Sequence, residues 1–209
     1  AKEYVHVGFG TINDSNGNPL KTRDGGNVQL TDLYTQTFKY IQKINNTLSN
    51  DDINGLTNTV LTFSDLITNR KTDYKFDLEK FTNVSGKAGI YIQYALVRAT
   101  RLLQSTAIKE INFQNGIKTP LEEIERNIIV GLANIEFFIE MSIKNNEPHH
   151  LANYLYEISN LFNTFYQDTN IKNLKDEDKK ITKITITYLF IKYSNLVMKC
   201  LGIEPVEKM

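Results

Sequence analysis

The chain contains 209 residues, 41% of them hydrophobic, and its 24 basic and 24 acidic side chains give a formal net charge of zero. This length and composition are enough to bury a sizeable core in one or two domains. The balanced charge argues against a protein that binds nucleic acid through its overall charge, although it is compatible with a local basic surface.

The apolar runs and the cysteine content indicate what kind of compartment the protein occupies. No apolar run approaches membrane-spanning length, which predicts a protein without a membrane partner. The single cysteine, Cys200, excludes an internal disulfide framework and indicates a reducing compartment, so we expect the cytoplasm. Cys200 falls on the apolar side of the last predicted helix, where we expect it to be a small buried side chain.

The first part of the chain is predicted to be a small β-hairpin followed by helices. Residues 4–12 alternate between apolar and small or polar side chains, which is typical of a strand, and Asn16-Gly17 favours a tight turn after it. A short alternating piece at 28–30 completes the hairpin. Helices are predicted from about 31 to 48 and from about 51 to 70, with a loop and a short helix after them.

Gly86–Gln104 forms a predicted helix that is apolar on nearly every face. A helix with one solvent-exposed side shows a single apolar stripe, so this helix is expected to lie centrally with neighbours packed around it. Tyr91 and Tyr94 each combine an apolar ring with a hydroxyl that needs a partner, which suits the edge of a core that faces a polar ligand. We therefore expect both rings to lie where the packing ends.

Further helical patterns cover the rest of the chain, from about 120 to 145, 151 to 167 and 181 to 201. Thr119 and Pro120 resemble the cap and first turn of a helix, and Gly202 is a helix stop. The pattern predicts a mainly α fold, with an antiparallel bundle of about four helices from Gly86 onward.

Two clusters of residues suggest chemistry at the level of sequence alone. Lys21, Thr22 and Arg23, followed by Gly25-Gly26, form a basic loop that can bind phosphate, although a solvated hairpin tip is the simpler interpretation of these residues by themselves. Aromatic rings in the helices can stack on unpaired bases, although most are expected to be core. They are Tyr91, Tyr94, Tyr154, Tyr156, Phe162, Phe165 and Tyr166.

The histidines do not show a metal-ligand pattern. His149 and His150 stand just before a helix, and His6 stands alone in the predicted strand. Without cysteines or clustered carboxylates at ligand spacing, no metal site is predicted.

Five segments, in order along the chain, together resemble one family, the class I arginyl-tRNA synthetases. HVGFGTINDSNGNPLKTRDGGNVQLTDL resembles their signature-loop region, and NRKTDYKFD resembles the segment between their catalytic domain and helical bundle. GIYIQYALVR and NYLYEISNLFNTFY resemble helices of the anticodon-binding bundle, and LGIEPVEKM resembles the carboxyl end of these enzymes. The matching segments span nearly the whole chain.

The resemblance implies that the chain is the C-terminal part of an arginine–tRNA ligase. Residues 1–84 are then the end of a Rossmann-type catalytic domain, and residues 85–209 are the anticodon-binding bundle. Lys21, Thr22 and Arg23 match the loop that closes on ATP, with Mg²⁺, during arginyl-adenylate formation, where cations stabilise the charge growing on the phosphates. The main catalytic core precedes this region in the family, so the chain alone is expected to be inactive.

The same resemblance assigns contacts with tRNA(Arg) to Tyr91, Tyr94, Arg98, Tyr166 and the terminal Met209. The other expected partners are the N-terminal and catalytic portions of the parent chain, and we expect a monomer.

Two alternatives remain open at the level of sequence. One is a free-standing helical RNA-binding or regulatory module related to the synthetase, and the other is an α-helical scaffold without an RNA role. The chain begins with Ala1, and we expect a piece of a longer protein, which an open reading frame continuing upstream would support.

Overall fold

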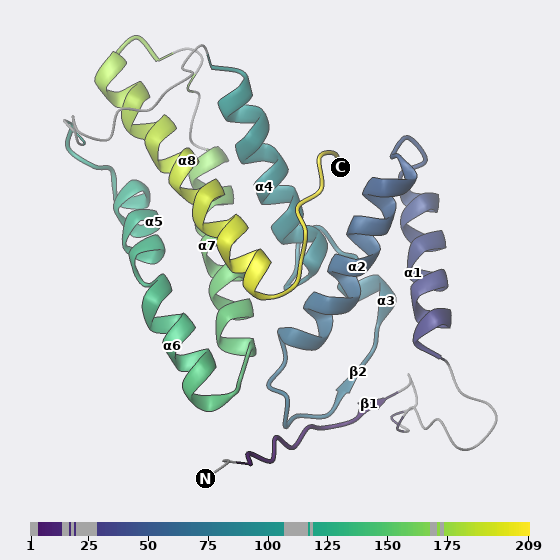
Figure 1. The fold of residues 1–209 in the computed structure, drawn as a ribbon. Coiled ribbons are helices and arrows are strands. Elements are labelled where there is room, and N and C mark those ends of the chain that lie inside the picture. Colours follow the sequence, from purple (N-terminus) through teal and green to yellow (C-terminus); the bar gives the residue numbers. More distant parts are fainter. Residues whose placement is uncertain are drawn as a thin grey trace.

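The computed structural model describes residues 4–13, 17, 19, 29–106, 117, 119–167, 171 and 174–209. Helices dominate this part of the chain, as predicted, with a bundle on one side and a smaller helical group with two short strands on the other (Figure 1). None of the helices described is long and apolar enough to cross a membrane. The loop of Lys21, Thr22 and Arg23 lies outside the described residues.

The strand predicted over residues 4–12 is largely wrong. Only β1 (Ile12–Asn13) is a strand, and it pairs in parallel with β2 (Tyr74–Lys75), with Ile12 opposite Tyr74. An isolated antiparallel bridge between Asn13 and Pro19 is what the described residues show of the predicted hairpin. A strand needs a neighbour to take its backbone hydrogen bonds, and the described parts of the chain offer residues 4–9 no neighbouring strand.

The smaller helical group begins with the antiparallel pair α1 (Leu30–Ile44) and α2 (Asn50–Leu66). At the start of α1, Gln29 and Asp32 form a reciprocal capping box, so the helix begins slightly earlier than predicted. A short helix, α3 (Leu78–Phe81), follows β2. A separate small core joins this group, consisting of Ile41, Ile53, Leu56, Val60, Phe81 and Ile90.

The helix α4 (Gly89–Gln104) is central, as its all-round apolar pattern predicted. It contacts α2 on one side and both α7 (His149–Gln167) and α8 (Glu177–Cys200) on the other. Gly89 allows the close approach to α2, because a Cβ at this position would lie 2.7 Å from the backbone oxygen of Thr59.

The remaining side of the bundle contains α5 (Glu123–Ala133) and α6 (Ile135–Asn145), which lie along α7 (Figure 1). The sequence predicted one continuous helix here, but Asn134 interrupts it, and its backbone N–H bonds to the Gly131 oxygen, three residues back rather than four. The predicted start at Thr119 is also displaced, because Glu122 caps α5.

A buried lysine side chain of α8 contacts the first turn of α5. Lys183 of α8 is 5% exposed, and its Nζ lies 2.8 Å from Glu125 Oε1 and 3.2 Å from Glu122 Oε2. Although burial opposes the charge, hydrogen bonds to both carboxylates raise the pKa of Lys183. The capping box of α5 is therefore also the counter-ion site of α8.

The end of α8 turns the chain back onto the bundle. Gly202 ends the helix in the left-handed conformation, with φ of 69°, as predicted. The tail then runs back between α4 and α2 (Figure 1). Cys200 is exposed and not buried as expected, because Val197, Met198 and Leu201 occupy the buried side of this turn.

Candidate nucleic-acid interface

The exposed edge of the contact between α4 and α7 gathers aromatic, amide and basic side chains. We call this surface the α4–α7 seam. It extends over about three helical turns of α4, or roughly 16 Å. It consists of Lys87, Tyr91, Tyr94 and Arg98 from the α4 side and Tyr156, Asn160, Asn163 and Tyr166 from α7.

Arg98 organises one half of the seam. Its guanidinium lies 3.9 Å from the ring centroid of Tyr94 and 5.1 Å from that of Tyr166. It also donates a hydrogen bond to the Tyr94 hydroxyl and another, of 3.4 Å, to Asn163 Oδ1. The contact with both rings is a cation–π arrangement that holds a planar cation at a partly exposed edge. Three residues predicted as tRNA contacts, Tyr94, Arg98 and Tyr166, therefore lie together.

Tyr91 organises the other half. Its hydroxyl donates to Asn160 Oδ1 at 3.0 Å, and its ring lies 5.4 Å from that of Tyr156, measured between centroids. Lys87 Nζ lies 5.2 Å from the Tyr156 ring. Burial, with Tyr91 and Glu157 nearby, raises the pKa of the Tyr156 phenol, which stays a neutral hydrogen-bond donor at neutral pH.

Met209 lies beside the seam rather than in it. It lines a mostly apolar groove of about 180 Å³ together with Tyr94, Ile90 and residues of α1 and α2. The terminal residue and the central helix thus share one small concavity, to which Tyr94 contributes from the seam side.

Gln93 fixes the tail that brings Met209 to this position. Its side chain is fully buried, and its amide nitrogen donates to Thr59 Oγ1 at 2.8 Å and to the Glu204 oxygen at 2.7 Å. Its amide oxygen accepts from the Val206 backbone N–H at 3.1 Å. One side chain of α4 therefore joins the tail to α2.

Part of the aromatic set proposed from sequence is core. Phe162 and Phe165 are fully buried, and Tyr154 is 3% exposed with its hydroxyl bonded to the Leu132 oxygen at 3.2 Å. Four of the seven rings, those of Tyr91, Tyr94, Tyr156 and Tyr166, reach the surface at the seam.

Sequence reasoning missed the polar residues of the seam. Asn160 and Asn163 are three residues apart on α7, a spacing that places both on one helix face beside Tyr156 and Tyr166. Asn163 Nδ2 is buried and has no hydrogen-bond partner among the described residues. A buried amide donor without a partner costs free energy, and a hydrogen bond to an acceptor would remove that cost.

Two family models match the chain, one in its C-terminal part and one in its N-terminal part. The family model described as "DALR anticodon binding domain" matches residues 92–209, and the model described as "tRNA synthetases class I (R), catalytic domain" matches residues 1–78.

Individual relatives agree with the family models. The arginine–tRNA ligase of Francisella tularensis is 35% identical over 98% of this chain and 36% of its own length, and that of Alkaliphilus oremlandii is 31% identical over 97% and 36%. The chain thus spans about a third of the length of these curated relatives.

Solved structures show the same fold. Arginyl-tRNA synthetase from Plasmodium falciparum superimposes with a TM-score of 0.73 at 25% identity, covering 87% of this chain and 34% of that one. The enzyme from Thermus thermophilus superimposes with a TM-score of 0.83 at 17% identity, covering 98% and 35%. The N-terminal part matches the class I tRNA synthetase catalytic-domain model over residues 1–78, and the chain belongs to the DALR anticodon binding domain family.

Proposed function

We propose that this chain is the C-terminal third of an arginine–tRNA ligase and that its α4–α7 seam binds the anticodon of tRNA(Arg). The family and the arginine–tRNA ligase relatives support the parent activity, which attaches arginine to its tRNA with ATP. The observation that carries the site is the partly exposed guanidinium of Arg98, which contacts the rings of both Tyr94 and Tyr166.

The seam offers both components that recognition of an unpaired nucleotide needs. Rings and a planar guanidinium provide stacking surfaces, which are worth about 1–3 kcal/mol per base. The hydroxyl of Tyr91 and the amide of Asn160 provide edge hydrogen bonds once the bond between them is exchanged. In this proposal Met209 closes the apolar side of the site beside Tyr94.

The N-terminal part is proposed to serve the ATP side of the parent enzyme. Lys21, Thr22 and Arg23 would contact the phosphates of ATP, which the parent enzyme uses with Mg²⁺, when the parent's catalytic core is present. The chain alone lacks a counterpart of most of that domain, so we expect it to bind tRNA without charging it. In this proposal the parent acts as a monomer in the cytoplasm.

A direct test compares binding of tRNA(Arg) by the chain with binding by a Tyr91→Ala, Tyr94→Ala double variant. Loss of two stacking rings should weaken binding by about 2 kcal/mol or more, which is roughly 30-fold. Phe137→Ala is the matched control, because Phe137 is an aromatic residue of α6 that is 58% exposed. Equal affinity of the double variant and the control would remove the seam from the site.

A further inference from the structure

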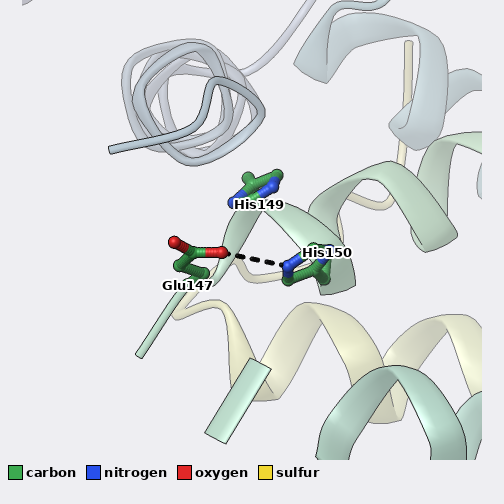
Figure 2. Close-up of side chains that lie close together, drawn as sticks. All are labelled: Glu147, His149 and His150. Atoms are coloured by element: carbon green, nitrogen blue, oxygen red, sulfur yellow. Dashed lines mark hydrogen bonds and ion pairs between the residues drawn. The ribbon is translucent and has the colours of Figure 1, made fainter. Parts of the chain in front are cut away.

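The turn between α6 and α7 brings three metal-ligating side chains together. Asn146 ends α6 in the left-handed conformation, with φ of 51°, and the Glu147 backbone N–H returns to the Ser142 oxygen at 3.0 Å. α7 then begins at His149. Figure 2 shows that the side chains of Glu147, His149 and His150 converge at this turn.

The distances between the three side chains are close to those between the ligands of a metal ion. His150 Nε2 lies 3.2 Å from Glu147 Oε2, and one ligand atom from each residue lies within 4.8 Å of the others. The centroids of the two imidazole rings are 4.0 Å apart. His149 Nδ1 is buried and has no hydrogen-bond partner among the described residues, which is an unexplained cost unless another group binds there.

We propose that Glu147, His149 and His150 form a binding site for a divalent transition-metal ion of the zinc class. Two imidazole nitrogens and one carboxylate oxygen are a common zinc ligand set that leaves a fourth position for water. Tetrahedral bonds of 2.0–2.2 Å place neighbouring ligand atoms about 3.4 Å apart. The pair of His150 and Glu147 already has this separation, so a side-chain rotation of His149 would complete the site.

Two nearby cations limit the affinity. Lys71 Nζ lies 3.5 Å from Glu147 Oε1, whereas His150 contacts the other carboxylate oxygen, Oε2. The Lys71 side chain is 65% exposed, so it can rotate away into solvent. Arg70 is held by the backbone oxygens of Asn146 and Gly8. We therefore expect a dissociation constant in the micromolar range rather than the nanomolar range of closed structural sites, and neutralising Lys71 should tighten binding.

The position of the site gives the ion a structural consequence. The loop after α2 contacts this turn through Arg70 on the Asn146 oxygen, and it contacts the first turns of α7 through Asn153 Nδ2 on the Ile67 oxygen at 3.3 Å. A bound ion would stiffen the turn on which the catalytic-domain end rests against the bundle.

The experiment is a Zn²⁺ titration of the full 209-residue chain at pH 7.5 by competition with a chromophoric chelator, together with thermal unfolding. We expect one ion per chain and a melting temperature that rises with Zn²⁺ concentration. His149→Gln and His150→Gln should each weaken binding at least tenfold, with circular dichroism confirming that both fold. Lys71→Gln should bind more tightly than the unchanged chain.

The remaining histidine and the single cysteine provide the matched control. A His6→Gln, Cys200→Ser double variant removes the third histidine and the single cysteine of the chain and should bind as the unchanged protein does. Absence of saturable binding below 1 mM Zn²⁺ would overturn the proposal. So would binding that survives both histidine substitutions at the turn, or binding that the control variant abolishes.

Discussion

Replacing Gln93 by leucine tests a buried side chain of α4 that makes three hydrogen bonds. Leucine has a similar size but makes none of the three hydrogen bonds to Thr59, Glu204 and Val206. At about 1 kcal/mol net for each bond, the variant should lose about 3 kcal/mol of unfolding free energy. For a chain of this length that corresponds to a fall in melting temperature of roughly 6–12 °C.

The assay is urea unfolding followed by circular dichroism, with limited proteolysis to report whether the tail is released. If the tail detaches, cleavage after Lys208 should become fast, and tRNA binding should weaken because Met209 leaves the groove beside Tyr94. Gln104→Leu is the control, since it makes the same change at an exposed position of α4. A Gln93→Leu variant as stable and as protease-resistant as the control would refute this account of the tail.

Three further changes probe separate features of the fold. Lys183→Met should cost about 3–5 kcal/mol in urea unfolding, because Glu125 would be left as a buried charge without its partner. Gly89→Ala should cost about 1–3 kcal/mol by the same measurement, because its Cβ would meet the Thr59 backbone oxygen, and a neutral result would exclude a tight crossing. His149 has a lowered pKa in the folded chain, so it contributes stability above its ordinary pKa of about 6.5 that is lost as the pH falls below it. Thermal unfolding between pH 7.5 and 5.5 should therefore show a smaller loss for His149→Gln than for the unchanged chain, whereas parallel curves would contradict this.

Helix periodicity predicted most of the bundle because burial follows it directly. The all-round apolar pattern of Gly86–Gln104 required neighbours on several sides, and α2, α7 and α8 supply them. The same reasoning failed at residues 4–12, where an alternating pattern indicates a strand but cannot supply a neighbouring strand. It also missed the break at Asn134, because the apolar spacing continues across that residue.

The candidate sites depend on contacts that a linear pattern does not record. Tyr91, Tyr94 and Tyr166 were predicted from the resemblance to a family, whereas their partners Asn160 and Asn163 become visible only when α4 lies against α7. Gln93 likewise acquires its role from a tail more than a hundred residues later. The roles of Lys21, Thr22 and Arg23, and the domain boundary at residues 84–85, stay predictions.

The most direct test of the central claim is the affinity of the unchanged chain for tRNA(Arg) compared with the same tRNA carrying a substituted anticodon, at one fixed salt concentration. Base readout at the α4–α7 seam predicts tighter binding of the native anticodon by about 1–3 kcal/mol for each recognised base, or roughly 5–150-fold. Equal affinity for the two tRNAs would show that the seam does not read the anticodon.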